Sequence, residues 1–229
     1  MQNDESTPKD KWNSYDFIEE HLFNAELSWE ESQRRYDQWA RDGSYDKILG
    51  NQPTVYNAPL AFHDGMIDLF QDKTAVRILD VACGTGLSGQ VLHDLGYTNI
   101  DGLDASAGSI EIARKKGIYT KFHNCKIGGD TPVPIPDNTY DAACMSGAFA
   151  PGHLPLSALP EIIRIIKPGG YFMNCMREEF FTSVPEYANK FLPLLESMVK
   201  DGKIRQVAWT IYPHHYLNND GVRMIYQKL

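Results

Sequence analysis

The sequence predicts an α/β fold built on a mostly parallel sheet, and three observations carry this prediction. Residues 76–81 form a short apolar run rich in β-branched side chains, followed by a glycine-rich turn and a helical pattern over 87–95. Strand-like and helical patterns then alternate as far as residue 176, as they do in a parallel sheet. Two last strand-like runs, 204–212 and 222–228, flank the hairpin signal Asn218-Asn219-Asp220-Gly221 and predict an antiparallel addition.

The first 73 residues predict a polar tail and a helical cap. Residues 1–12 are polar and charged, as in a loose tail. Ser28-Trp29-Glu30-Glu31 fits a capping box, so a helix is expected to begin there. A second helical stretch is expected over 57–70. We therefore expect residues 1–73 to form a tail and a cap over the site, ahead of an α/β domain that spans 74–229.

After the first strand, predicted helices and strands alternate along the sequence. Ser106 suits a helix N-cap, so a helix over 107–116 is expected to follow the strand 99–104 directly. Pro168 and the two glycines after it end the helix expected over 156–166. The remaining predicted elements are strands at 118–122, 140–145 and 171–176 and a long helix over 185–200, where Tyr187, Phe191, Leu194, Leu195 and Met198 recur at helical spacing.

The turn after the first strand has the residues of a nucleotide pocket. Glycines let a ligand approach the backbone, and the helix that follows offers free N–H groups. Asp80 beside the turn disfavours a pyrophosphate and favours a cationic ligand, whereas Asp104, at the end of the next strand, suits ribose hydroxyls. The spacing Gly84-x-Gly86-x-x-Gly89 also satisfies the dinucleotide fingerprint. These glycines therefore leave both an S-adenosylmethionine site and an NAD site open.

Composition narrows the range of partners. The 229 residues carry a formal net charge of −8 and no lysine- or arginine-rich run, which argues against nucleic acids and anionic membranes as partners. The four cysteines lack C-x-x-C spacing, so we expect free, mostly buried thiols and no metal site. The polar N-terminus and the lack of a long apolar run predict a cytoplasmic protein. Nothing in the sequence indicates an oligomeric state.

Five stretches in this order resemble class I S-adenosylmethionine-dependent methyltransferases. They are Tyr36-Asp37-Gln38-Trp39-Ala40, Ile78-Leu79-Asp80-Val81-Ala82-Cys83-Gly84-Thr85-Gly86, Gly102-Leu103-Asp104, Pro136-Asp137-Asn138-Thr139-Tyr140-Asp141 and Ile166-Lys167-Pro168-Gly169-Gly170. Within this class the chain most resembles the Williams–Beuren-region methyltransferase-like group, which is similar to it in the first two stretches, in Gly147-Ala148-Phe149 and in Ala158-Leu159-Pro160-Glu161. The resemblance covers over half of the chain and implies a Rossmann-like sheet of seven strands.

The resemblance also implies the cofactor and its contacts. S-adenosylmethionine would be bound and S-adenosylhomocysteine released, with Asp80 and the turn near the methionine part and Asp104 at the ribose. Members of the family often hold adenine with an acid after the third strand; here Cys125 stands in that region, so backbone groups are expected to hold the adenine. The residues expected to bind the cofactor are Tyr36, Trp39, Asp80, Ala82, Gly84, Gly86, Asp104, Ala105, Cys125, Lys126 and Ser146.

The acceptor is expected near the loops after the fourth and fifth strands and near the hairpin, because ligands of open α/β sheets bind beyond the carboxyl ends of the strands. Arg177 suits a substrate carboxylate through its planar fork, or forms an ion pair with Glu178 or Glu179. The residues expected to bind substrate are Phe149, His153, Arg177, Tyr212, His214 and Tyr216.

Two residues are candidates for a catalytic role. His153 is the candidate base, or else a loop histidine bonded to the backbone, and Tyr212 is the second candidate. His214 and His215 are adjacent on a strand and face opposite ways, which disfavours a metal pair.

Together these features predict methyl transfer to a small-molecule acceptor. Transfer from a sulfonium is an in-line displacement by a nitrogen, oxygen or sulfur lone pair. The donor is activated by its own charge, so the protein mainly positions and desolvates the reactants. Two alternatives remain. One is an NAD(P)-dependent oxidoreductase, supported by the glycine spacing and Asp104, and the other is a cofactor-binding regulatory protein without turnover.

Overall fold

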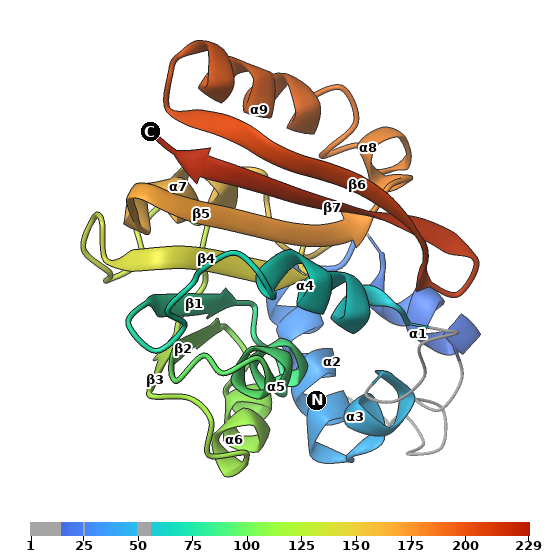
Figure 1. Ribbon diagram of the computed structural model, residues 1–229. Coiled ribbons are helices and arrows are strands. Elements are labelled where there is room, and N and C mark those ends of the chain that lie inside the picture. Colours follow the sequence, from blue (N-terminus) through green and yellow to red (C-terminus); the bar gives the residue numbers. More distant parts are fainter. Residues whose placement is uncertain (1–14, 25, 50–55) are drawn as a thin grey trace.

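The computed structural model describes residues 15–24, 26–49 and 56–229, and the polar tail expected at 1–12 lies outside them. A central sheet runs through the molecule with helices on both of its faces (Figure 1). Its strands are β1 (Arg77–Val81), β2 (Asn99–Asp104), β3 (Lys121–Asn124), β4 (Tyr140–Ser146), β5 (Ile166–Arg177), β6 (Ile204–Tyr216) and β7 (Asn219–Lys228).

The strand order is β3-β2-β1-β4-β5-β7-β6 in one seven-stranded sheet. The first five strands are mutually parallel, and β7 pairs antiparallel with both β5 and β6. This arrangement confirms the predicted Rossmann-like, mostly parallel sheet with a terminal antiparallel hairpin. Strand β1 is apolar along most of its length because both of its faces are covered: Leu79 and Val81 pack on one side and Ile78 on the other.

Helices cover the two faces of the sheet in separate groups. Helices α7 (Ala158–Ile165) and α9 (Phe191–Lys200) pack on the face that carries Leu79, whereas α4 (Ala58–Met66) and α5 (Leu87–Asp94) pack on the face that carries Ile78. The other described helices are α1 (Tyr15–Leu22), α2 (Trp29–Arg41), α3 (Ser44–Leu49), α6 (Ala107–Lys115) and α8 (Phe180–Ser183).

Helix α2 joins the N-terminal segment to the sheet. It begins where the capping box predicts, since the Ser28 hydroxyl accepts a hydrogen bond from the Glu31 amide at 3.2 Å. Farther along the helix, the Asp37 carboxylate accepts bonds from the Ser106 hydroxyl and from the Gly108 amide, the latter at 3.0 Å. A carboxylate is favourable at this place because the free N–H groups of α6 face it.

The other N-terminal helices differ from the expectation. The helical stretch expected over 57–70 forms only α4, and α1 and α3 were not predicted. Helices α1, α2 and α3 share a small core of their own, which is made of Ile18, Leu22, Trp39, Ile48 and Leu49 together with Tyr216 from the hairpin.

Two further elements differ from the prediction in extent. The long helix expected over 185–200 begins only at Phe191, because Asn189 adopts a left-handed conformation with φ +57° and Tyr187 bonds elsewhere. The Tyr187 hydroxyl donates to the carbonyls of Ala150 and Leu154, at 3.0 and 2.6 Å. The third strand lies at 121–124 instead of 118–122. Its displacement brings Tyr119 out of the sheet and towards Asp80.

The hairpin turn also lies earlier than its sequence signal. Strand β6 continues to Tyr216, which pairs with Asn219, so the turn consists of Leu217 and Asn218. A shift of register between Tyr212 and Tyr216 marks a bulge, where His214 has φ +57°. Because of this bulge, the alternation of inward and outward side chains near the end of β6 is not the one expected for a regular strand.

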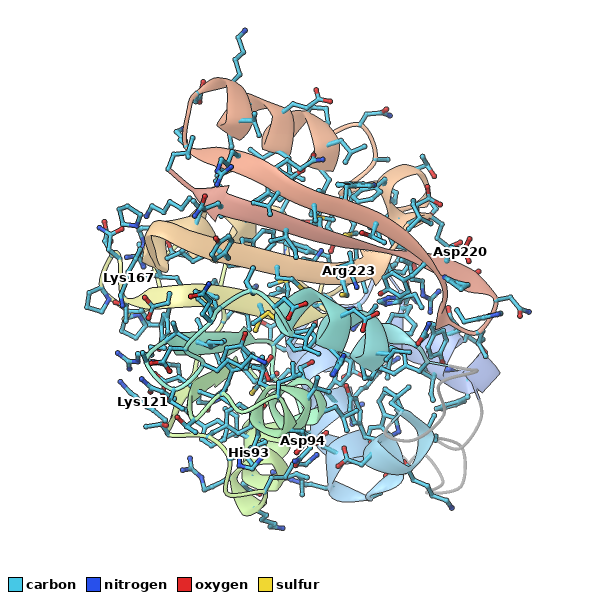
Figure 2. All side chains as sticks on the ribbon, in the orientation of Figure 1. His93, Asp94, Lys121, Lys167, Asp220 and Arg223 are labelled. Carbon is cyan, nitrogen blue, oxygen red and sulfur yellow. The ribbon has the colours of Figure 1, made fainter. Side chains whose placement is uncertain are left out.

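The two ends of the sheet differ in what surrounds them. Lys121 and Lys167, near the amino ends of β3 and β5, lie at one edge of the molecule in Figure 2, and Asp220 of the hairpin lies at the opposite edge. The segments at the carboxyl ends of the parallel strands contact the N-terminal helices: Gln33 of α2 donates to the carbonyl of Ala105 at 2.7 Å. In the described ranges, no helix combines the length and apolarity needed to cross a bilayer.

Candidate active site

A cleft opens beyond the carboxyl ends of the parallel strands, and is termed here the strand-end cleft. It has about 800 Å³ of open space and lies between helix α2, the turn after β1 and the segments that follow β2, β3 and β4. The residues predicted to bind the cofactor that line it are Tyr36, Ala82, Gly84, Asp104, Ala105, Cys125, Lys126 and Ser146. The structure therefore brings these eight predicted residues together around one cleft.

Asp104 is held at the cleft by the backbone around it. One carboxylate oxygen accepts from the Gly84 amide and the other from the Ser106 amide, both at 2.8 Å. Burial raises the pKa of Asp104, and these two amide bonds act against the rise. Each carboxylate oxygen has a further lone pair, so Asp104 can accept two more hydrogen bonds from a diol such as ribose.

The backbone of the turn leaves room for a ligand. Ala82 and Gly84 both have φ +54°, and a Cβ at Gly84 would stand 3.5 Å from the Tyr45 hydroxyl across the cleft. Gly147 has φ +69°, and its Cβ would lie 3.2 Å from the Tyr56 hydroxyl. The positive φ angles of Gly84 and Gly147 suit glycine, and the absence of a side chain at these two positions leaves the space open. The turn, the two glycines and Asp104 thus fit a nucleoside-bearing cofactor.

Asp80 does not line the cleft, although the sequence placed it beside a cationic ligand. It is 1% exposed and accepts from the Tyr119 hydroxyl at 2.7 Å, and the Gly89 amide of α5 also donates to it. Burial raises the pKa of Asp80 to about 7. Because side chains alternate along β1, the carboxylate lies under the turn, on the side of α5. In this structure Asp80 is thus bonded beneath the turn and does not line the strand-end cleft.

Two other predicted cofactor residues also lie off the cleft. Gly86 is the N-cap of α5, with φ +90°, and a Cβ there would approach Tyr119 to 3.0 Å. Gly89, inside α5, is closer still, since a Cβ there would overlap the Tyr119 hydroxyl. These two glycines leave room for Tyr119. Trp39 is 1% exposed and lines a neighbouring cavity instead.

This neighbouring cavity is termed the aromatic cavity, and its empty volume is about 500 Å³ when the solvent at its mouth is included. Tyr36, Tyr45, Ser146 and Gly147 line both it and the strand-end cleft, so the two spaces meet at these residues. Most of its wall consists of aromatic rings, which come from Phe23, Tyr36, Trp39, Tyr45, Tyr56, Phe149, Phe180 and Tyr216. Phe149 and Tyr216 were expected at the substrate, and the structure places both here.

Arg177 supplies a cation to the aromatic cavity. It is 4% exposed and lies over three rings, with its guanidinium carbon 4.6 Å from the ring centroid of Tyr216. Its nitrogens form ion pairs with Glu19 of α1 and with Glu179, the latter at 3.3 Å. The structure thus shows the ion-pair arrangement for Arg177, with a second carboxylate that the sequence did not suggest. Two carboxylates are thus already paired with this guanidinium.

His153 and Tyr36 form a hydrogen-bonded pair in the strand-end cleft. The Tyr36 oxygen lies 2.5 Å from Nε2 of His153, and Nδ1 lies 2.8 Å from the carbonyl oxygen of Pro151. Burial lowers the pKa of His153 to about 4, and the charge of Arg177 acts in the same direction. Burial also raises the pKa of Tyr36. At neutral pH both side chains are therefore uncharged.

The hairpin histidines take the opposite places to those expected. His214 is exposed, and its Nδ1 lies 2.9 Å from the Leu217 carbonyl, whereas His215 is 3% exposed and lines the aromatic cavity. Burial lowers the pKa of His215 to about 3. The predicted substrate residue Tyr212 lies outside both cavities, with its hydroxyl 2.5 Å from Nδ1 of His215. The bulge before Tyr216 explains why His215 and not His214 faces inwards.

Sequence reasoning missed several residues of the site. Phe23, Tyr45, Tyr56 and Gln33 line one or both cavities, and all come from the N-terminal region. The aromatic content of this region was visible, but aromatic residues at helical spacing usually belong to a core. Among the described residues, no group of three or more histidine, cysteine or acidic side chains could hold a metal ion.

The arrangement suits a transfer between two bound molecules. A cofactor in the strand-end cleft and an acceptor in the aromatic cavity would meet beside Tyr36, Ser146 and Gly147. Bringing two reactants together in a closed site can lower a barrier by roughly 7–11 kcal/mol in favourable cases. The site can therefore act by positioning and by excluding water.

Comparison with known proteins agrees with this geometry. A model described as a methyltransferase domain matches residues 78–170. The human protein named methyltransferase-like protein 27 is 33% identical over 178 residues, which cover 77% of this chain and 69% of that protein. A demethylmenaquinone methyltransferase of Symbiobacterium thermophilum is 29% identical over 206 residues, covering 80% of this chain and 79% of that one.

A solved structure supports the same fold. A SAM-dependent methyltransferase from Aquifex aeolicus aligns with a TM-score of 0.52 and 20% identity, over 76% of this chain and 92% of that one. The matched methyltransferase domain contains the glycine turn and Asp104, and these findings remove the alternative of an NAD(P)-dependent oxidoreductase. The chain therefore belongs to the class I S-adenosylmethionine-dependent methyltransferases, and it is an enzyme whose cofactor is S-adenosylmethionine.

Proposed function

We propose that the enzyme methylates a small molecule that binds in the aromatic cavity, while S-adenosylmethionine binds in the strand-end cleft. The observation that carries this proposal is the shared boundary of the two cavities at Tyr36, Tyr45, Ser146 and Gly147. A methyl acceptor has to lie directly beside its donor, and the aromatic cavity is the space that adjoins the cleft there.

The proposed roles at the cofactor follow from the contacts. Asp104 accepts the ribose hydroxyls, the backbone from Ala82 to Gly84 lies along the methionine part, and Cys125 and Lys126 border the adenine. The cofactor supplies a methyl group on a positively charged sulfur. The helices that precede residue 74 close this region as a cap, because Gln33 and Tyr36 of α2 line the cleft.

The proposed acceptor is small, largely apolar and without net charge. The wall of the aromatic cavity is rich in rings, the Arg177 guanidinium is already paired with Glu19 and Glu179, and His215 is neutral. An anionic acceptor would therefore have to displace a carboxylate already bound to Arg177. The net charge of −8 disfavours a nucleic acid as the acceptor. The similarity to a demethylmenaquinone methyltransferase also supports a small acceptor.

Transfer of labelled methyl groups tests this proposal. The enzyme is incubated with labelled S-adenosylmethionine and a panel of small phenols, amines and thiols, and in parallel with total RNA and denatured protein. Label is expected in small molecules. Phe180→Ala should raise the KM for such an acceptor about tenfold and leave the KM for the cofactor unchanged, because Phe180 lines only the aromatic cavity. Label found only in RNA or protein, or equal changes in the two KM values, would contradict the proposal.

A further inference from the structure

At the shared boundary of the two cavities lie two hydrogen-bonded polar side chains, and the donor and the acceptor of each of their bonds can be assigned. Tyr36, from α2, lines both cavities, and His153, from the loop after β4, lines the strand-end cleft. We propose that His153 is a positioning residue and not the catalytic base: its Nε2 accepts a hydrogen bond from the Tyr36 hydroxyl and so fixes the Tyr36 oxygen as an acceptor of hydrogen bonds at the point of methyl transfer. The inference rests on the proposed function only in placing the acceptor in the aromatic cavity.

The hydrogen-bond partners of His153 determine its tautomer. A carbonyl oxygen can only accept, so Nδ1, at 2.8 Å from the Pro151 carbonyl, must carry a hydrogen. In the neutral ring Nε2 is then the acceptor, and the Tyr36 hydroxyl at 2.5 Å is its donor. Both ring nitrogens are thus engaged within the protein, and neither has a lone pair left for a substrate proton.

The surroundings of His153 favour the neutral ring. Phe23 stacks on it, with ring centroids 5.4 Å apart, and Tyr36 lies edge-on at 5.3 Å. The charged groups around the ring are Arg177, whose charge opposes protonation, and Lys126 and Glu186, which line the groove on its outer side. Glu186 accepts from the Leu156 amide at 3.1 Å. Burial is the largest cause that holds the pKa of His153 to about 4.

The orientation of Tyr36 follows from this pair. Its single hydroxyl hydrogen is directed at Nε2 of His153, so the lone pairs of its oxygen remain for other donors. An oxygen lone pair suits the C–H groups of a methyl attached to a positively charged sulfur, because those hydrogens are polarised. Tyr36 thus aligns the methyl group of the cofactor, and the proton lost by the acceptor leaves to solvent.

The two forms of the cofactor provide a test that needs no acceptor. S-adenosylmethionine and S-adenosylhomocysteine differ in the methyl group and in the charge on sulfur. Tyr36→Phe is expected to weaken the binding of S-adenosylmethionine about twofold to fivefold more than that of S-adenosylhomocysteine in calorimetric titrations. His153→Leu should have the same selective effect. His153→Gln should show a smaller effect, because an amide oxygen can accept a hydrogen bond from the Tyr36 hydroxyl. A merely structural role would weaken both ligands equally.

A second tyrosine–histidine pair supplies the matched control. The Tyr212 hydroxyl lies 2.5 Å from Nδ1 of His215, but Tyr212 lines neither cavity. Tyr212→Phe should therefore leave the ratio of the two affinities unchanged. An unchanged ratio in Tyr36→Phe as well would overturn the proposal.

The tautomer of His153 is measured separately by nitrogen NMR. Protein labelled with ¹⁵N-histidine is recorded from pH 5.5 to 8, and the His153 signals are identified by their loss in His153→Gln. We expect Nδ1–H signals that do not move over this range. An Nε2–H tautomer, or a midpoint between pH 6 and 7, would instead identify His153 as an available base. If no small molecule accepts a methyl group but these results hold, the proposed acceptor site fails while the pair stands.

Discussion

The two cavities of the active site are assembled in different ways. The strand-end cleft is formed largely by the turn after β1 and the segments that follow β2, β3 and β4, with helices α2 and α3 across it. The aromatic cavity draws its residues from α1, α2, α3 and α8, from the loops between these elements and the sheet, from the end of β5 and from the hairpin, between residues 18 and 216. The strand-end cleft therefore depends largely on short local motifs, whereas the aromatic cavity depends on how distant segments pack together.

This difference predicts that substitutions at the two cavities affect different measurements. Substitutions in the strand-end cleft should change the affinity for the cofactor and have little effect on acceptor binding. Substitutions in the aromatic cavity should change stability or acceptor binding and leave the affinity for the cofactor unchanged. A residue whose substitution alters both would show that the two cavities are coupled.

The largest effect is expected for Asp104→Ala. Its carboxylate is proposed to accept two ribose hydroxyls, and charged hydrogen bonds contribute about 1.5–3 kcal/mol each, so the affinity for S-adenosylhomocysteine should fall about 100-fold or more. Isothermal titration calorimetry measures the loss. Asp141→Ala is the matched control, because Asp141 is a strand carboxylate paired with Lys167 at the other end of the sheet. Affinity within threefold of wild type in Asp104→Ala would remove Asp104 from the cofactor site.

An intermediate effect is expected for Asp80→Asn, and it depends on pH. The pKa of Asp80 is about 7 in the folded protein and about 3.9 when unfolded, so the folded state keeps a proton that the unfolded state has lost between these values. The stability that this proton supplies is fully present below pH 4 and is lost as the pH rises to 7. Relative to wild type, Asp80→Asn should therefore gain on the order of 2–4 kcal/mol over that range.

Urea denaturation between pH 4 and 8 measures this gain, which should level off above pH 7. Cofactor affinity should stay within about threefold of wild type, because Asp80 anchors the turn from beneath it and does not line the cleft. A stability difference that does not vary with pH would show that the carboxyl is ionised throughout. A large loss of affinity would return Asp80 to direct contact with the cofactor.

The smallest effect is expected for Arg177→Met. The substitution removes a buried cation but leaves Glu19 and Glu179 partly exposed to water, so the free energy of unfolding should fall by about 1–3 kcal/mol. Affinity for S-adenosylhomocysteine should not change, because Arg177 lines only the aromatic cavity. Chemical denaturation and calorimetry measure the two quantities. Arg205→Met, which removes an exposed bond to Gln227, should change neither; a reduced affinity in Arg177→Met would reveal coupling between the cavities.

The parts of the fold that could be predicted are those governed by local rules. Strand β2 lies at its predicted residues, and the caps at Ser28 and Ser106 form as expected, because a hydroxyl three residues before a free amide makes a bond that needs no distant partner. The helix expected from Pro185 could not be delimited in this way. Its apolar spacing continues through Tyr187, but that side chain packs against the loop after β4, and the chain turns at Asn189.

Two single residues, His215 and Asp80, show the same limit of prediction from local rules. The alternation of a regular strand could not reveal that His215 faces inwards, because the bulge between Tyr212 and Tyr216 is a property of the paired strands. The burial of Asp80 depends on Tyr119, which lies 39 residues away in the chain. Charge and proximity to the turn suggested a ligand contact for Asp80, and only the packing of Tyr119 against Gly89 assigns it to the interior.

The position of β7 determines the order in which the site can be completed during synthesis. Strand β7 lies between β5 and β6, so residues 204–216 have no partner in the sheet until residues 219–228 have been made. The residues of the strand-end cleft, by contrast, have all been synthesised by position 154. A growing chain has thus made every residue of the strand-end cleft well before the hairpin delivers His215 and Tyr216 to the aromatic cavity.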